Sequence, residues 1–199
     1  MPDFTIENEY RAKGFSVICG IDEAGRGPLS GPVVAAACIL PDGAEGWGLN
    51  DSKKLSPKKR DLLFDKIVES SIAYAIGYAS PDEIDSMNIL NATFAAMRRA
   101  LAGLGVTPDI ALIDGNLARG FDITAVPVIH GDALSCSIAA ASILAKVTRD
   151  RICAEDAIKY PEYNFASNKG YGTKEHMDAL RQYGPCPIHR RSFLKFLDT

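Results

Sequence analysis

Several features are scarce in this sequence of 199 residues, and each absence narrows the range of possible functions. The apolar runs are all far shorter than the roughly 20 residues needed to cross a membrane. Even Ile138–Leu144 is brief and is soon followed by Lys146. Residues 1–7 lack a basic region followed by an apolar core, so we expect no secretory signal. These absences predict a cytoplasmic protein with no membrane partner.

Paired cysteines are missing as well. The five cysteines, at positions 19, 38, 136, 153 and 186, are odd in number, scattered, and form no Cys-x-x-Cys pair. This spacing does not match a disulfide framework of a small secreted domain. We therefore expect the cysteines to be small buried apolar residues in a reducing compartment, without a chemical role.

An excess of positive charge is also absent, because 22 Lys and Arg face 25 Asp and Glu, for a net charge of −3. Composition alone therefore does not indicate a nucleic-acid partner. Basic residues do cluster at 53–60 and 189–195, although a solvated helix face explains a charge run equally well. Any binding to nucleic acid is expected to be modest and sensitive to salt.

The most informative segment that is present lies at residues 18–27. An apolar run of strand length ends in Asp22 and Glu23, and the turn Gly25-Arg26-Gly27 follows at once. Glycines allow positive φ and close backbone approach, and the arginine between them offers a fork for phosphate. Carboxylates beside such a turn would repel phosphate unless divalent cations lay between them. The segment predicts metal-assisted phosphoryl chemistry, although two solvated acids at a strand end explain it about equally well in isolation.

Two further acids fit the same pattern. Asp114 ends another apolar run and is followed by Gly115, and Asp132 stands at the mouth of a long helical segment. Apolar strands are typical of a sheet covered on both faces, and such sheets bind ligands at the carboxyl ends of their strands. Asp132 alone would more often be a helix cap. Acids at three element ends can converge on one point, and their hard oxygens suit Mg²⁺ or Mn²⁺ and not zinc.

The hydrophobic periodicity predicts one α/β domain in which a sheet is followed mainly by helices. Strands are expected at 16–22, 33–40, 72–78, 110–114 and, shorter, near 123–126. Helices are expected at 56–68, after the capping box at 80–83, at 88–101, and as one long helix over 134–160. The first of these helices should bury Leu62, Leu63 and Ile67. Since neighbouring strand residues face opposite ways, we also expect the first strand to end or bend at Asp22.

The sequence resembles bacterial ribonuclease HII in five motifs that occur in the same order. These are GIDEAGRGPLSGPV at 20–33, LNDSKKLSP at 49–57, IDGN at 113–116, Gly131-Asp132 with SIAAASILAKVTRDR at 137–151, and NKGYGTKEH at 168–176. The resemblance runs from about residue 16 to the C-terminus. It implies a ribonuclease H-like fold, with a mixed five-stranded sheet flanked by helices and a small helical C-terminal appendage. Residues 1–160 would form the catalytic domain and residues 161–199 the appendage, in a single functional domain.

The resemblance also implies an activity and a set of site residues. The family hydrolyses the RNA strand of RNA–DNA hybrids and cuts beside ribonucleotides embedded in duplex DNA, leaving 3′-hydroxyl and 5′-phosphate ends. The matching catalytic and metal-ligand positions are Asp22, Glu23, Asp114 and Asp132, with Asp22 as the bridge between two Mn²⁺ or Mg²⁺ ions. We expect the enzyme to act as a monomer.

Other positions match the parts of the family that bind substrate. The backbone of Gly25, Arg26 and Gly27 corresponds to the turn that reads the 2′-hydroxyl, and Tyr171 to the tyrosine that stacks on the neighbouring sugar. Without the resemblance, a tyrosine between two glycines would be better explained as a loop anchor packed on the core. Weaker matches for phosphate contacts are Lys53, Lys146, Lys169 and Arg191.

Two other functions are compatible with parts of the sequence. A metal-dependent 3′–5′ exonuclease would use similar acids but would not need the Gly-Arg-Gly turn or the motif around Tyr171. A non-catalytic module that binds RNA–DNA hybrids would keep basic and aromatic contacts without needing acids at three element ends.

Overall fold

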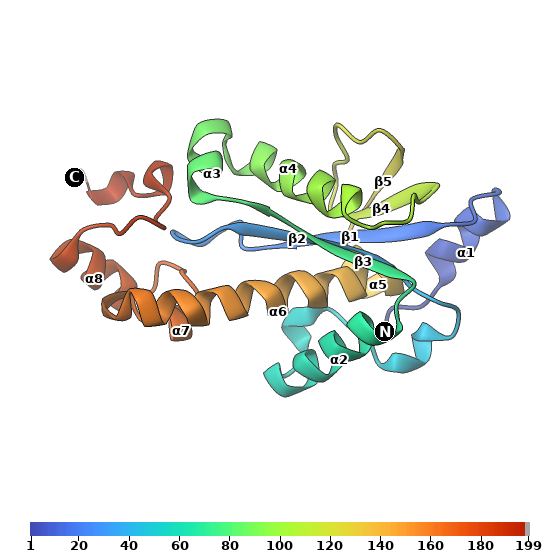
Figure 1. The fold of residues 1–199 in the computed structure, drawn as a ribbon, viewed down its shortest axis with the longest axis horizontal. Helices are drawn as coiled ribbons and strands as arrows, with labels where there is room; N and C mark the ends of the chain where they lie inside the picture. The colour runs from blue at the N-terminus through green and yellow to red at the C-terminus, as the bar shows by residue number, and fades with distance from the viewer. Residues whose placement is uncertain (198–199) are drawn as a thin grey trace.

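The computed structural model describes residues 1–197 and contains a mixed five-stranded sheet with helices on both faces (Figure 1). The strand order is β3-β2-β1-β4-β5, in which β1 pairs antiparallel with β2 and parallel with β4, β2 pairs antiparallel with β3, and β4 pairs parallel with β5. The strands are β1 (Ile18–Ala24), β2 (Val33–Ile39), β3 (Ala73–Ala79), β4 (Ile110–Asp114) and β5 (Thr124–Val128). This confirms the expected α/β fold class.

The helices separate into two layers around the sheet and a group beyond its end (Figure 1). They are α1 (Thr5–Ala12), α2 (Pro57–Ser70), α3 (Pro81–Met87), α4 (Ile89–Ala102), α5 (Gly131–Leu134), α6 (Cys136–Lys159), α7 (Phe165–Asn168) and α8 (Lys174–Tyr183). Short 3₁₀ turns are η1 (Ala44–Trp47), η2 (Ser52–Lys54), η3 (Pro161–Tyr163), η4 (Arg191–Phe193) and η5 (Lys195–Leu197). The capping box that was expected at the start of α3 is present, with Ser80 and Glu83 bonded to each other's backbone.

The core lies in two layers because the central strands are apolar on both faces. One apolar cluster joins the sheet to α2 and α6, and a second joins its other face to α4. Small residues bring α6 very close to the sheet: Ala139, Ala140 and Ala141 are fully buried, and a Cβ on Gly20 of β1 would overlap the α6 backbone at Ser137. The long helix is therefore fixed against the strand that carries Asp22.

Three sequence-based expectations were wrong in detail. Strand β1 does not end at Asp22, because its ladder with β2 continues to Ala24 while its pairing with β4 stops at Ile21. The long helix is broken at Ser135, whose extended backbone separates α5 from α6 and whose side chain caps α6. Leu62 is 63% exposed, so the buried stripe of α2 contains Leu63 and Ile67 but not Leu62.

The remaining features of the fold concern cysteines, membranes and the C-terminal residues. All five cysteines are buried and free, and burial raises the pKa of every thiol. None of the helices in residues 1–197 is long and apolar enough to cross a membrane. Residues beyond α6 have a small apolar cluster of their own, which includes Tyr163, Phe165 and Leu180.

Candidate active site

Asp22 and Asp114 directly follow the last paired residues of two neighbouring parallel strands. Ile21 of β1 is in register with Ile113 of β4, so the next residues along the two strands are these two aspartates. Adjacent strands are about 4.8 Å apart. The sheet pairing thus brings together two carboxylates that are 92 positions apart in the sequence, 114 against 22.

Asp22 is a buried carboxylate next to two other acids. Its side chain is 5% exposed, and its Oδ1 accepts a hydrogen bond of 2.7 Å from the backbone N–H of Glu23. Burial raises the pKa of Asp22 well above its usual range, and the charges of Glu23 and Asp114 raise it further. A hydrogen bond from Ser142 of α6 acts in the opposite direction, and Ser142 is itself 3.0 Å from the hydroxyl of Ser52.

Glu23 and Asp132 approach the same group from other directions. Burial raises the pKa of Glu23, against the effect of Arg26, whose guanidinium lies 3.3 Å from the carboxylate. Asp132 lies in the first turn of α5, where its backbone N–H is 3.3 Å from Oδ1 of Asp114. The pKa of Asp132 is raised by its burial and by the negative charges of Asp114 and Asp51. The structure therefore brings all four predicted acids into one electrostatically coupled group.

The chemistry of these acids fits a divalent cation. Within residues 1–197, no group of three or more Asp, Glu, His or Cys side chains is placed so that it could hold a metal ion. The acids nevertheless supply hard oxygens, and burial together with their mutual repulsion raises the pKa of Asp22 and of Asp132, against an opposing effect of Lys53 on Asp132. A bound divalent cation removes that repulsion, because its charge is opposite and close.

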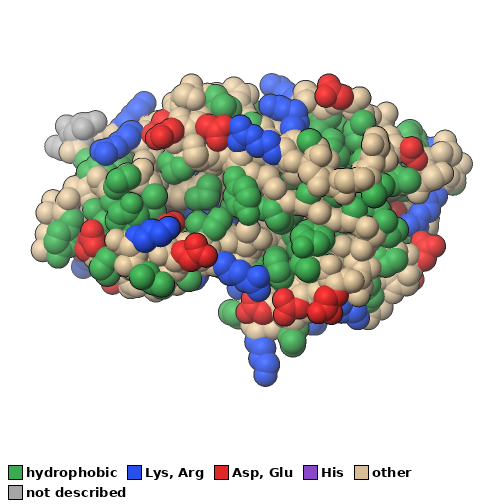
Figure 2. All heavy atoms as spheres, viewed as in Figure 1, with side chains coloured by type: hydrophobic (Ala, Val, Ile, Leu, Met, Phe, Trp, Pro, Cys, Tyr) green, Lys and Arg blue, Asp and Glu red, His purple; other side chains and the backbone are tan. Residues whose placement is uncertain are grey.

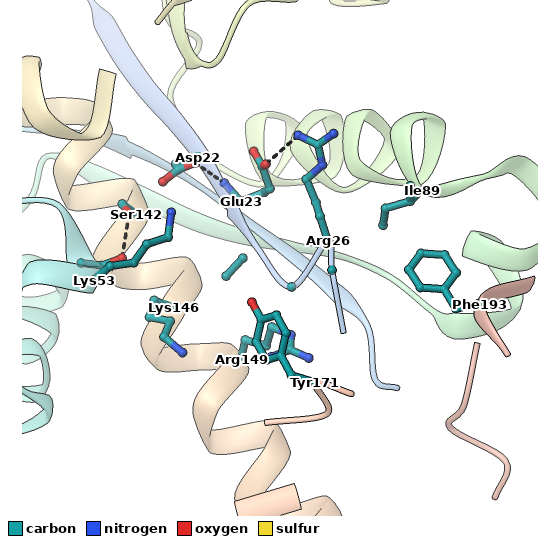
Figure 3. Close-up of a pocket in the computed structure, with 14 residues that line it drawn as sticks. Asp22, Glu23, Arg26, Lys53, Ile89, Ser142, Lys146, Arg149, Tyr171 and Phe193 are labelled. Carbon is teal, nitrogen blue, oxygen red and sulfur yellow. Dashed lines mark hydrogen bonds and ion pairs between the residues drawn. The ribbon is translucent and has the colours of Figure 1, made fainter. Parts of the chain in front are cut away.

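A cavity of about 680 Å³ adjoins the acids. Figure 3 shows Asp22 and Glu23 at one part of its wall, Tyr171 at another, and Ile89 with Phe193 beyond Arg26. Its surroundings carry charges of both signs, and Figure 2 shows acidic and basic side chains interspersed over one face of the molecule. The cavity thus has a lining of acidic and basic side chains in one part and of apolar side chains in another.

The Gly25-Arg26-Gly27 turn borders this cavity and is held from behind by two buried arginines. Gly25 has a φ of +94°, and a Cβ there would overlap the side chain of Arg149. Arg190 is fully buried and donates hydrogen bonds of 2.6–2.9 Å to four carbonyls, those of Gly25, Arg26, Pro28 and Gly31. The carbonyls of the turn are therefore occupied on the side away from the cavity.

Sequence reasoning missed several residues of this site. Arg149 and Arg190 were part of a quoted motif and of a basic cluster, but nothing in a one-dimensional pattern shows that they are buried beneath the turn. Ser142 and Asp51 also belong to quoted motifs and were not singled out. The signal for them was their place within the motifs at 49–57 and 137–151.

Tyr171 lies on the rim of the cavity, 48% exposed. A Cβ on Gly27 would lie 3.5 Å from its Cε1, which places the ring directly beside the turn. The exposed ring is not packed on the core as a loop anchor would be.

The four predicted phosphate-contact residues lie in different places. Lys53 and Lys146 line the cavity, and Lys146 forms an ion pair of 2.6 Å with Asp150. Lys169 lines a separate, smaller cavity of about 280 Å³, and Arg191 lies in η4 on the surface. The structure therefore places two of these four cations at the cavity.

The family model for ribonuclease HII matches residues 19–196 of this chain. The chain belongs to the ribonuclease HII family. A ribonuclease HII of Desulfitobacterium hafniense (strain DSM 10664 / DCB-2) is 58% identical over 187 residues, which are 94% of this chain and 72% of that protein. One from Burkholderia mallei (strain SAVP1) is 55% identical over 185 residues, 93% of this chain and 86% of that protein.

Solved structures agree with this family assignment. The ribonuclease H2 of Pyrococcus horikoshii OT3 has a TM-score of 0.76 at 29% identity and covers 92% of this chain and 98% of its own. Bst-RNase HIII in complex with Mn²⁺ has a TM-score of 0.59 at 19% identity, with 82% of this chain and 69% of its own covered, and supports the fold. As a member of the ribonuclease HII family, the protein is an endoribonuclease that acts on RNA–DNA hybrids.

Proposed function

We propose that this enzyme also cuts at single ribonucleotides embedded in duplex DNA, and that it does so by two-metal-ion catalysis. Asp22, Glu23, Asp114 and Asp132 would hold the divalent cations, Mn²⁺ or Mg²⁺. The observation that carries this proposal is the buried carboxylate of Asp22 on β1, next to Asp114, because burial and its acidic neighbours raise the pKa of Asp22. Cations held there would supply the means to activate a water and to neutralise charge on the leaving oxygen.

The reaction is a hydrolysis at phosphorus. The oxygen of water forms a bond to the scissile phosphate, the bond from phosphorus to the 3′ oxygen breaks, and a proton goes to that 3′ oxygen. The products carry 3′-hydroxyl and 5′-phosphate ends. Lys53 and Lys146, which line the cavity, would contact the backbone phosphates near the cut. Lys169 and Arg191 would contact the duplex farther away, because they lie outside the cavity.

Recognition of the ribonucleotide would come from the turn and from Tyr171. A 2′-hydroxyl both donates and accepts hydrogen bonds, and this property distinguishes RNA from DNA. The backbone at Gly25, Arg26 and Gly27 would read this hydroxyl, since Arg190 holds the carbonyls of the turn in place. The half-exposed ring of Tyr171 would stack on the adjacent sugar.

The same proposal covers the organisation of the chain. Residues 1–160 would form the catalytic domain, and residues 161–199 an appendage that completes the site by supplying Tyr171 and Arg190; of this stretch, 198 and 199 lie outside the described residues. The enzyme would act as a monomer, because every proposed site residue comes from one chain. It would act in the cytoplasm, where bacterial DNA containing ribonucleotides is found.

A duplex with one internal ribonucleotide and blocked ends tests the proposal. We expect a single cut beside the ribonucleotide, which requires added Mg²⁺ or Mn²⁺ and leaves a 5′-phosphate detectable by mass spectrometry. An all-DNA duplex of the same sequence is the control and should remain intact. A 3′–5′ exonuclease would leave the blocked substrate uncut, and a non-catalytic binding module would retain it without cleavage at any metal concentration.

A further inference from the structure

The position of Tyr171 is set by its backbone, because its side chain is only half-buried. Its N–H donates to the carbonyl of Asn168 at 2.9 Å. Its carbonyl accepts two hydrogen bonds, from the N–H of Thr173 at 2.8 Å and from Nδ1 of His176 at 2.9 Å. His176 is thus the buried side chain that binds the backbone of Tyr171, and this hydrogen bond orients the peptide group that carries the tyrosine ring.

His176 in turn contacts a second buried histidine. Its Nε2 lies 3.0 Å from Nε2 of His189, and His189 Nδ1 lies 3.0 Å from the backbone N of Cys186 and 3.1 Å from its Sγ. His176 is fully buried and His189 is 2% exposed. Both rings pack against Tyr163 and Phe165, at centroid distances of 4.9–6.2 Å.

The hydrogen-bond partners permit one assignment of the ring protons. A carbonyl accepts, so His176 must carry its proton on Nδ1 and leave Nε2 as an acceptor. His189 must then carry its proton on Nε2, which leaves its Nδ1 free to accept from the N–H of Cys186. In this assignment Cys186 donates to His189, His189 donates to His176, and His176 donates to the carbonyl of Tyr171. A second proton on either ring would bring two N–H groups into contact.

The surroundings keep both rings neutral. Burial lowers the pKa of His176, and burial together with the charge of His176 lowers the pKa of His189 to about 4. The groups around the pair are Tyr163 of η3, Cys186, and Arg191 of η4, and Arg191 also lowers the pKa of His189. Figure 3 shows the ring of Tyr171 directed toward the turn that carries Arg26.

We propose that His176 is a positioning residue for Tyr171 and that His189 fixes the tautomer in which it works. The inference rests on the proposed role of Tyr171 in reading the sugar. The segment from Cys186 to Arg190 would then support both groups that read the sugar. His189 would act on Tyr171 through His176, and Arg190 holds the carbonyl of Gly25 in the turn. Discrimination at a single ribonucleotide would thus depend on a buried pair that never contacts substrate.

Two substitutions at one position separate the two bonds of His176. The amide nitrogen in His176→Asn occupies the place of Nδ1 and still donates to the Tyr171 carbonyl. His176→Gln instead reaches toward His189 and loses that donor. We expect His176→Gln to lower cleavage at a single embedded ribonucleotide by roughly three- to tenfold relative to an all-RNA strand, the scale of one neutral hydrogen bond. His176→Asn should keep the wild-type ratio within about twofold.

A combined variant checks that the effect passes through the tyrosine. In a Tyr171→Ala background, His176→Gln should change the ratio between the two substrates no further, because the group it positions is gone. Equal losses on both substrates in His176→Gln, or the same ratio in the Asn and Gln variants, would overturn the positioning role.

A spectroscopic test is independent of activity. Long-range ¹H–¹⁵N NMR at neutral pH should show His176 protonated at Nδ1 and His189 at Nε2, in the metal-free enzyme. Finding His176 protonated at Nε2, or either ring doubly protonated, would overturn the inference whatever Tyr171 does. If the tautomers are as expected but Tyr171→Ala affects both substrates equally, the proposed reading of the sugar fails and the inference falls with it.

Discussion

Gly27 and Tyr171 face each other across the rim of the active-site cavity, with room for ordinary contact and little more. A Cβ on Gly27 would stand 3.5 Å from Cε1 of the tyrosine, and no other heavy atom would lie within 4 Å of it. The turn and the ring thus form two sides of one opening, although they are separated by most of the chain.

Alanine at the two glycines of the turn should have different effects. Gly25→Ala requires a positive φ of +94° and overlaps Arg149, so we expect a loss of stability of about 1–3 kcal/mol together with a loss of cleavage. Gly27→Ala meets neither obstacle and should leave the melting temperature unchanged. It should still reduce cleavage, because the added methyl group lies where the sugar would pass. Thermal melts and cleavage rates on both variants check the pair, and a destabilised Gly27→Ala would contradict the geometry.

Tyr171→Ala should weaken cleavage at a lone ribonucleotide more than cleavage of an all-RNA strand. An all-RNA strand offers other 2′-hydroxyls to hold the register, while a lone ribonucleotide offers one. Loss of an aromatic stacking contact is worth about 1–3 kcal/mol, which corresponds to roughly a ten- to hundredfold fall. Cleavage rates on matched duplexes give the ratio.

Tyr171→Phe is the matched control, since it keeps the ring and removes the hydroxyl. It should retain most of the stacking contribution on both substrates. Because Tyr171 is 48% exposed, neither variant should change the melting temperature appreciably. Equal losses on both substrates with a lowered melting temperature would instead make Tyr171 a structural anchor.

Asp22→Asn and Asp114→Asn should each abolish cleavage while leaving the fold intact. Each removes a negative charge that a divalent cation requires, and neither side chain is part of the apolar clusters. We expect rates to fall by more than ~100-fold, the upper end for loss of an outer-shell partner of a metal. Asp132→Asn should be milder, since an amide oxygen still ligates weakly. Substantial turnover of the Asp22 or Asp114 variant at saturating Mg²⁺ would remove that residue from the metal site.

Much of this architecture could be predicted from the sequence. Strand-length apolar runs gave five strands within about two residues of their observed ends, and the acids at 22 and 114 were recognised because each follows such a run. The strand β1 was expected to stop at Asp22 on local grounds. It continues because β2 still pairs with Asp22 and Glu23, and a long-range pairing of this kind leaves no local signal.

The supports of the site were not predictable in the same way. Arg190 belongs to a basic cluster that resembles a solvated surface, yet it is fully buried among four backbone carbonyls. His176 and His189 are thirteen residues apart and show no metal-ligand spacing, so their contact depends wholly on tertiary packing. The sequence motifs identified the residues that are proposed to contact the substrate. The buried residues that support them, Arg190, His176 and His189, are brought into place by tertiary packing.

The stability of the metal-free enzyme should reveal the repulsion at the acids through its pH dependence. The pKa of Asp22 in the folded protein lies above the ordinary value of 3.8, so the folded state holds this proton more tightly than the unfolded state. The proton on Asp22 therefore stabilises the folded state in full below pH 3.8, and this stabilisation is lost as pH rises through the pKa of Asp22 in the folded protein. Asp22→Asn should therefore melt at a higher temperature than wild type at pH 7 without metal, and the difference should vanish near pH 4 and below. The titrating histidines are common to both proteins and cancel from the difference. Added Mg²⁺ should raise the melting temperature of the wild-type enzyme at pH 7 but not that of Asp22→Asn. If the difference in melting temperature between the two proteins did not vary with pH, Asp22 would not be the carboxylate whose pKa is raised by folding.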